Sequence, residues 1–338
     1  MIERWIKNDL TLKRWRRFSS IRRAVFSVWL LAVMLFFSFT AEFWANSKPL
    51  VMSYKGSLYF PVVKDYYPTN FDQDGMVTNY RAIDLKTAGG WAVWPPVKWD
   101  PYELNEGLAT YPAPPSGENW LGTDDRGRDV LSRLIYGFRY SIIFAVAVWL
   151  VSFSVGTMVG AITGYRGGRI DLVGQRLVEI FDSLPYILML LTLIAFLGAS
   201  LKLLVIFAAA LGWMGISTYM RAEFLKLRKR EFVEAAKAQG VSVSRILFRH
   251  MLPNALGPLI TFSPPAIASN IYTLAILDYL GLGLPPPTPS WGELLQQAQS
   301  NVTIAWWLAV YPSLAMVLSL TALTFIGEGV REAYDPRK

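Results

Sequence analysis

The sequence predicts an all-α integral membrane protein with six transmembrane helices. Its apolar residues are gathered into blocks that carry almost no charge, at residues 24–41, 140–163, 184–220 and 305–326. Crossing a bilayer takes roughly 20 such residues in a helix. The 13 Trp and 16 Tyr residues suit membrane interfaces, where amphipathic rings collect. Basic residues lie beside the apolar blocks, so the net charge of +8 indicates orientation in a membrane and not nucleic-acid binding.

The scarcity of two residue types excludes several kinds of site. The chain has no cysteine, which rules out disulfides and thiolate metal sites. His250 is its only histidine, so a histidine-rich metal cluster is excluded as well.

The first span is expected at residues 24–44, after a cytoplasmic basic segment at 1–23. The segment carries Arg4, Lys7, Lys13, Arg14, Arg16, Arg17, Arg22 and Arg23, and such a basic flank places the N-terminus in the cytoplasm. A signal peptide is the alternative. Its apolar core would span only about 7 to 15 residues and end at a small-residue cleavage site, whereas this run is longer and ends in Glu42-Phe43-Trp44.

Residues 45–138 are mixed polar and are predicted to form a periplasmic insertion with an interfacial helix at its end. Tyr59–Val63 and Trp91–Trp94 are candidate strands, and Ala109–Asn119 has the composition of a proline-rich linker. After an Asp/Arg cluster, one apolar face predicts the interfacial helix, with Val130, Leu131, Leu134, Ile135 and Phe138. The alternative for the cluster itself is a solvated, self-paired turn.

The second to fourth spans are expected at 140–163, 177–198 and 203–220, with a turn at Gly167-Gly168. Glu179 and Asp182 lie in the third span, where a charge is costly unless it faces water or protein. They are therefore candidates for lining a pathway, although both are near enough to the cytoplasmic end to reach headgroup water. Pro185 is a candidate kink in the same helix.

The loop at 221–254 is predicted to fold as helix, bend, helix. Phe232, Ala235, Ala236 and Gln239 share helical spacing in 231–239, and Gly240 stops that helix. Ser242 can cap a second helix with Val243, Ile246, Leu247 and Met251 on one face, and Pro253 is expected to end it. Four crossings from the N-terminus and two from the C-terminus both place this loop in the cytoplasm.

The fifth and sixth spans are expected at 255–280 and 304–326. Pro264 and Pro265 should kink the fifth, and with Asn270 they are candidates for lining a pathway, with kinked packing as the alternative. Asp278 is expected in water near the exterior end. The intervening loop, 281–303, has no Lys or Arg, and Ser290 with Glu293 fits a capping box.

The loop at 221–254 resembles the EAA loop of permease subunits in bacterial ATP-driven importers. The resemblance lies in Glu234-Ala235-Ala236, then Gly240, then His250-Met251-Leu252-Pro253 at matching spacing. In that family the loop is the coupling helix that sits in a groove of the ATPase. The resemblance therefore implies coupling roles for Glu234, Ala235, Ala236, Gly240, His250, Leu252 and Pro253. The alternative is a cytosolic loop whose alanines only help packing.

Two further segments and the C-terminal tail resemble the second permease subunit of dipeptide and oligopeptide importers. They are Gly122-Thr123-Asp124 with Gly127-Arg128-Asp129, Leu280–Gly283 with Ser290-Trp291-Gly292, and Gly327 to Asp335-Pro336. The chain departs from those relatives at Leu274 and Asp278, so no role is carried over to either. The insertion at 46–118 resembles that of permeases assigned to microcin C and oligopeptide uptake.

The resemblance implies the type I ABC importer permease fold, with residues 139–338 as the permease core, in the bacterial inner membrane with both termini cytoplasmic. It implies a peptide permease that is not an enzyme and binds no cofactor, because no Gly-x-x-x-x-Gly-Lys-Ser/Thr loop is present and ATP and Mg belong to a partner ATPase. A second permease subunit, separate or fused ATPases, a periplasmic peptide-binding protein and membrane lipid are the implied partners, and nucleic acid is not. The alternatives are a permease for another solute such as nickel, and an integral-membrane enzyme using Glu179 and Asp182.

Overall fold

The computed structural model describes residues 8–335, so Arg4, Lys7 and Pro336 of the predicted motifs lie outside the described residues. The chain divides into two compact units. Unit 1 comprises Met1–Leu31, Ile142–Leu277 and Val317–Lys338, and unit 2 comprises Ala32–Ser141 and Asp278–Met316.

The helices confirm a multi-span membrane architecture. Within residues 8–335, five helices are long and apolar enough to cross a membrane, and a bent pair gives a sixth if it crosses as one span. The five are Arg22–Phe39, Val130–Arg166, Leu201–Leu227, Leu259–Tyr279 and Trp306–Tyr334. The sixth predicted span therefore continues as a helix through most of the tail.

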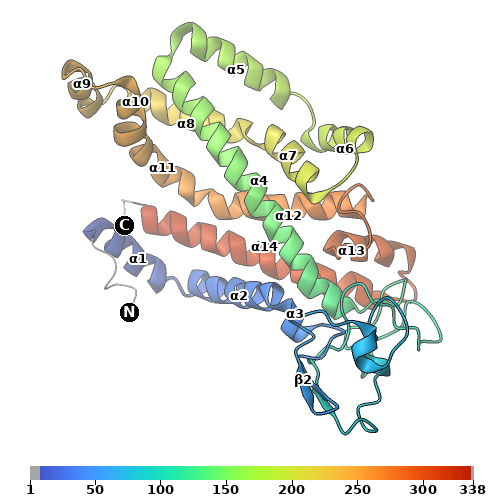
Figure 1. Cartoon of the computed structure of the whole chain (residues 1–338). Helices are drawn as coiled ribbons and strands as arrows, with labels where there is room; N and C mark the ends of the chain where they lie inside the picture. Colours follow the sequence, from blue (N-terminus) through green and yellow to red (C-terminus); the bar gives the residue numbers. More distant parts are fainter. Residues whose placement is uncertain (1–7, 336–338) are drawn as a thin grey trace. The chain divides into compact units, whose positions relative to one another are not determined.

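Unit 1 is built from helices (Figure 1). They are α1 (Asp9–Ser20), the first part of α2 (Arg22–Phe39), most of α4 (Val130–Arg166), α5 (Gly168–Asp182), α6 (Tyr186–Leu197), α7 (Leu201–Gly212), α8 (Met214–Leu227), α9 (Glu231–Ala238), α10 (Val243–Arg245), the π-helix η4 (Ile246–Met251), α11 (Leu252–Thr261), α12 (Ser263–Tyr279) and the end of α14 (Trp306–Tyr334).

The third predicted span, 177–198, consists of two helices, and the kink predicted at Pro185 is confirmed as a break between them. Helix α5 begins at Gly168. The chain turns into it through Gly167 and Gly168, whose φ angles are +65° and +58°. The helix ends at Asp182, and α6 starts after Pro185 at an angle of 75° to α5. The proline breaks the helix because it has no N–H to continue the hydrogen bonds of α5 and disfavours a helical residue before it, and it stands as the N-cap of α6.

Helices α4 and α8 approach closely through glycines spaced four residues apart on α4. A Cβ added at Gly160 would lie 2.4 Å from the Ser217 carbonyl oxygen, and Gly156 and Gly164 are equally close to α8. Small residues at this spacing let the backbones of membrane helices come together. The side chain of Arg221 in α8 also binds Asp171 of α5 through two hydrogen bonds, one of them 2.7 Å long.

Unit 2 contains the short helix α3 (Ala41–Trp44), the amphipathic helix α13 (Trp291–Ser300) and a small sheet. Strands β1 (Val51–Tyr54), β2 (Ser57–Tyr59) and β3 (Trp91–Val93) pair antiparallel in the order β2-β1-β3, with Met52 opposite both Tyr59 and Ala92. Two 3-10 turns follow β2, η2 (Pro68–Phe71) and η3 (Tyr80–Ala82).

The secondary structure predicted within residues 45–138 is only partly right. The strand at 91–94 is confirmed, but of 59–63 only Tyr59 is in a strand, since the chain turns at Pro61. The aromatic ring of Phe71 forms the centre of the core there, in edge contact with the rings of Tyr54, Tyr59, Tyr66 and Tyr80. The apolar face at 130–138 is not a separate interfacial helix, because α4 runs without a break from Val130 to Arg166.

Candidate functional site: the knuckle at residues 230–253

The knuckle, residues 230–253, is a helical hairpin in unit 1 that connects α8 to α11 (Figure 1). Its first helix, α9, has Glu231 and Glu234 in the first turn, where carboxylates stabilise the positive end of a helix. Gly240 has a φ of +73°. The Gly240 N–H bonds to the Lys237 carbonyl (2.9 Å) and the Val241 N–H to the Ala236 carbonyl (3.1 Å), which is a Schellman cap. The predicted glycine stop is therefore confirmed, with a definite geometry.

A buried apolar cluster, here called the knuckle core, holds the hairpin in place. Its members come from four elements: Met220 and Phe224 of α8, Val233 and Ala236 of α9, Ile246 and Met251 of η4, and Ala255 and Leu259 of α11. Val241, the residue after the glycine, packs against it. Because helices α8, α9 and α11 share one core, a force on α9 is transmitted to both of its neighbours.

The predicted contact surface at Ala235 and Ala236 is wrong for one of the two alanines. Ala236 is only 7% exposed and belongs to the knuckle core, whereas Ala235 is exposed beside Glu234. The helix presents Glu234 and Ala235 outward because Val233 and Ala236, three residues apart, form its inner face.

The expected end of the second helix at Pro253 is also wrong. The chain stays helical from Val243 through Thr261, passing through the π-helix η4. The Leu252 N–H bonds to the Leu247 carbonyl five residues back, in the wider hydrogen-bonding pattern of a π-helix, and Pro253 follows as the second residue of α11. In the described chain the Ser242 hydroxyl caps no helix N–H, so Ser242 starts α10 through its backbone conformation alone.

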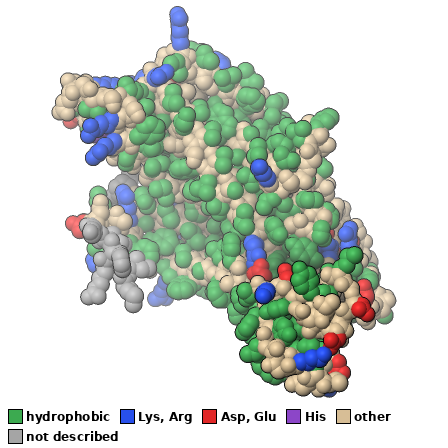
Figure 2. Space-filling model, in the orientation of Figure 1, with side chains coloured by type: hydrophobic (Ala, Val, Ile, Leu, Met, Phe, Trp, Pro, Cys, Tyr) green, Lys and Arg blue, Asp and Glu red, His purple; other side chains and the backbone are tan. Residues whose placement is uncertain are grey.

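Three exposed apolar side chains of the knuckle were not predicted as site residues. Phe248 is 62% exposed, Val243 is 49% exposed and Phe232 is 41% exposed. Phe248 does not share the helix face of the buried residues Ile246 and Met251. This difference in helical spacing can be seen in the sequence. Figure 2 shows Lys and Arg side chains gathered over α9 and α10, so the apolar groups are set in a basic surface.

The remaining predicted coupling residues, His250, Leu252 and Pro253, lie at the end of the knuckle that leads into α11. His250 is half-buried, and its carbonyl accepts a hydrogen bond from Asn254 Nδ2 (2.7 Å). Leu252 packs against the knuckle core, while Pro253 is exposed.

A pocket of about 450 Å³ lies in unit 1 next to the knuckle core. Its lining side chains include Tyr186 of α6, Ile216 and Tyr219 of α8, Leu259 and Phe262 near the end of α11, and Ser269, Asn270 and Thr273 of α12. Leu259 is thus shared between the pocket and the knuckle core.

Asn270 is the one predicted pathway residue that the structure brings to this pocket. It lines the wall while its Nδ2 donates to the Ala145 carbonyl of α4 (3.0 Å). Glu179 and Asp182 are exposed on α5, and Glu179 accepts a hydrogen bond from Arg176 (2.6 Å).

The two adjacent prolines do not line this pocket, and the fifth predicted span is interrupted just before them, at Phe262. Pro264 and Pro265 occupy the first turn of α12, after a break at Phe262, where proline is tolerated. A Cβ on Gly327 would lie 2.8 Å from Pro265 Cδ, so the prolines pack against α14.

Unit 2 contains a second motif-bearing feature, here called the buried charge network. It joins Asp124 and Arg128, just before α4, with Arg133 in the first turn of α4 and Glu293 of α13. Arg128 bonds Asp124 (2.6 Å) and Glu293 (2.9 Å), and Arg133 bonds the other oxygen of Glu293. Burial alone would lower the pKa of the Arg128 guanidinium, but the two carboxylates outweigh it and raise the pKa.

The structure of unit 2 corrects the sequence prediction for Asp124 and Glu293 of the network and for Asp278 outside it. Asp124 is fully buried, so the Asp/Arg cluster is not a solvated turn. Ser290 caps α13 as predicted, but the Glu293 carboxylate binds the arginines. Asp278 is 6% exposed and not wetted, since it accepts hydrogen bonds from the Leu284 N–H (2.6 Å) and the Ser290 hydroxyl.

Comparison with known proteins agrees with this architecture. Residues 156–338 match the family model described as the binding-protein-dependent transport system inner membrane component. The inner membrane ABC transporter permease protein YejE of Escherichia coli is 40% identical, with 96% of each chain covered. The peptidoglycan transport system permease protein YejE of Agrobacterium fabrum is 39% identical over 97% of this chain and 93% of that protein.

A shorter relative matches less of the chain. The dipeptide transport system permease protein DppC of Bacillus subtilis is 32% identical over 69% of this chain and 73% of that protein. Together with the family match over more than half of the chain, these relatives show that it belongs to the family of binding-protein-dependent transport system inner membrane components.

Proposed function

We propose that the chain is a transmembrane permease subunit of an ATP-binding-cassette importer that carries peptides across the bacterial inner membrane. Its relatives are named permeases, and that of Bacillus subtilis is named for dipeptide transport. Those names favour peptides over nickel as the solute. The chain itself is non-catalytic and binds no cofactor, and ATP is hydrolysed with Mg by partner ATPase subunits.

The knuckle is the docking site for the ATPase in this proposal. Glu234, Ala235, Val243 and Phe248 form the outward surface that the ATPase contacts. Gly240 shapes the hairpin, while His250, Leu252 and Pro253 join it to α11.

One observation carries the mechanism: Leu259 belongs both to the knuckle core and to the wall of the pocket. When ATP closes the ATPases, the knuckle moves with them, and α8 and α11 follow because they share its core. Tyr219 and Phe262, whose rings meet edge to edge at 5.4 Å in the pocket, then shift with those helices. The pathway, with Asn270 in its wall, opens to the exterior, where a peptide-binding protein delivers the solute.

The remaining assignments complete the assembly. A second, unlike permease subunit provides the other half of the pathway, the two termini face the cytoplasm, and residues 45–138 face the exterior. Five of the predicted pathway residues do not line the pocket, so we assign the pathway to the pocket side chains instead: Glu179, Asp182, Pro185, Pro264 and Pro265.

The test compares Glu234→Lys with Glu106→Lys, a charge reversal at an exposed position of unit 2. We expect Glu234→Lys to abolish uptake of labelled peptide and co-purification of the ATPase, with normal amounts of the chain in the membrane. Glu106→Lys should change neither. Normal uptake and ATPase binding in Glu234→Lys would refute the docking site. If nickel ions, and not unlabelled peptides, inhibited the uptake of labelled peptide, the assignment of peptides as the solute would be refuted.

A further inference from the structure

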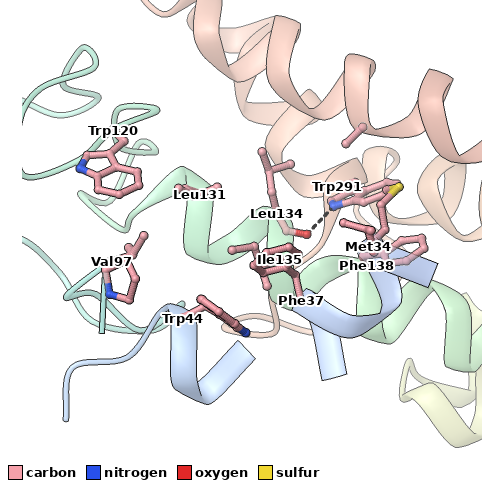
Figure 3. Close-up of a pocket in the computed structure, with 13 residues that line it drawn as sticks. Met34, Phe37, Trp44, Val97, Trp120, Leu131, Leu134, Ile135, Phe138 and Trp291 are labelled. Atoms are coloured by element: carbon pink, nitrogen blue, oxygen red, sulfur yellow. Dashed lines mark hydrogen bonds between the residues drawn. The ribbon is translucent and has the colours of Figure 1, made fainter. Parts of the chain in front are cut away.

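Unit 2 contains an open pocket of about 400 Å³ whose lining side chains are all apolar (Figure 3). It is more than twice as large as the roughly 150 Å³ apolar cavity that in another protein stays free of water and binds benzene. Its walls come from the end of α2, the start of α4, the loop residues Pro96, Val97 and Trp120, and single residues of α3, α13 and α14. Val33, Met34 and Phe37 form the α2 wall, and Leu131, Leu134, Ile135 and Phe138 form the α4 wall.

The polar atoms of two tryptophans in the wall are already used. Trp291 Nε1 donates to the Leu134 carbonyl (2.9 Å), and Trp44 Nε1 donates to Thr40 Oγ1 (2.8 Å). An ordered water needs two to four polar partners, which these rings do not offer. The pocket therefore suits a hydrocarbon and not a hydrated solute.

The pocket lies at the ends of membrane-spanning helices. Its α2 residues belong to the last half of the first span, and its α4 residues to the first turns of the next. Trp44, Trp120 and Trp291 line it, and tryptophans gather at the level of lipid headgroups. Val33 is 48% exposed and Phe37 is 38% exposed, so the α2 wall is open on its outer side, as expected of a surface that faces lipid.

An ion pair stands at the edge of the pocket. Arg139 directly follows the lining residue Phe138, and its guanidinium donates to the carbonyl of Ser38 (2.8 Å), the residue after Phe37. The Glu42 carboxylate accepts from both terminal nitrogens of the same guanidinium (2.7 and 3.0 Å), and the Arg139 side chain remains 21% exposed. An apolar pocket with a paired guanidinium and carboxylate at its rim complements an amphiphile with a hydrocarbon chain and a zwitterionic headgroup, whose phosphate meets the guanidinium and whose ammonium meets the carboxylate.

We propose that this pocket binds one acyl chain of a membrane phospholipid, with the phosphate beside Arg139. The chain then fills the space between the end of α2 and the start of α4. The lipid is a bound component of unit 2, and the proposal does not depend on which solute is carried.

The test uses the full chain, purified in mild detergent with its accompanying subunits, and a phosphatidylethanolamine that carries a photoreactive diazirine on its acyl chain. We expect the lipid to label peptides that contain Leu131 or Met34. Ala315→Phe places a ring into the pocket from α14 and should reduce this labelling about tenfold, which corresponds to about 1.4 kcal/mol. Leu314→Phe adds a ring at the neighbouring, 52% exposed position and should leave the labelling unchanged.

Val33→Trp fills the pocket from the opposite wall and should give the same loss as Ala315→Phe. It serves as the second variant if Ala315→Phe fails to accumulate in the membrane. A photoreactive amino acid at position 131 that cross-links to another protein subunit instead of lipid would overturn the proposal. Equal labelling in the pocket-filling variants and in Leu314→Phe would overturn it as well.

Discussion

The knuckle of unit 1 and the buried charge network of unit 2 use the same kinds of charged side chain in opposite ways. In the knuckle, Glu234 and the arginines point outward and the interior is apolar. In the network, Arg133 and Asp124 are fully buried and the charges bind one another. Exposed charges around an apolar core leave a surface free for another protein to bind and release. Buried, paired charges fix two segments together permanently.

The largest expected effect is on the network. Arg133→Met leaves Glu293 and Asp124 short of a partner in the interior, and breaking a buried pair in this way costs about 3 to 5 kcal/mol. Chemical unfolding of the purified chain, followed by tryptophan fluorescence, measures this free energy.

Arg176→Met is the matched control. It removes a pair with Glu179 in which the side chains are 71% and 56% exposed, and such a pair contributes roughly 0 to 1 kcal/mol. If both variants lost the same free energy of unfolding, the buried charge network would stabilise the fold no more than an exposed ion pair does.

The next effect separates the two alanines of the knuckle. Ala236→Leu overfills the knuckle core and should lower the free energy of unfolding by about 1 to 3 kcal/mol. Ala235→Leu is exposed and should stay within about 0.5 kcal/mol of the original chain while it obstructs ATPase binding. A stable Ala236→Leu variant would mean that the inner and outer faces of α9 are wrongly assigned.

A smaller effect is expected at Gly240, where the cost is conformational alone. A Cβ there would meet nothing within 4 Å, but the φ of +73° is unfavourable for a β-branched residue. Gly240→Val should therefore cost about 1 to 2 kcal/mol and lower peptide uptake. Gly240→Asn, which reaches left-handed φ more readily, should retain most of both. If valine and asparagine behave alike in uptake assays, the bend does not depend on this backbone conformation.

The smallest effect on stability is expected at Phe248. Its side chain is 62% exposed, so Phe248→Ser should change the free energy of unfolding by less than about 0.5 kcal/mol. Loss of ATPase co-purification at unchanged stability is the expected result. A large loss of stability would place Phe248 in the core and not on the binding surface.

The features that were predictable from the sequence are those set by neighbouring residues. Apolar blocks and basic flanks located most spans, because length and hydropathy decide whether a helix can cross a bilayer. Gly240 was recognisable because few other residues can end a helix as it does. The resemblance at Glu234-Ala235-Ala236 indicated a contact surface, and the first two of these residues are exposed whereas Ala236 is buried.

The features that were not predictable depend on residues far apart in the chain. Arg128 meets Glu293 165 residues later, so their burial cannot be deduced from either segment alone. Pro253 was expected to end a helix because the usual rule assumes α-helical hydrogen bonds before it. The π-helix before Pro253 supplies a different pattern, and only the folded structure shows it.

That π-helix also fixes how α11 is rotated about its own axis. An α-helix turns by about 100° for each residue, so a single additional residue in η4 swings every side chain beyond it by about that angle. Leu259 and Phe262 face the pocket in this setting. If η4 changed from π-helical to α-helical hydrogen bonds, α11 would rotate about its own axis and turn other side chains toward the pocket. The contacts of α9 with a bound partner protein would not change.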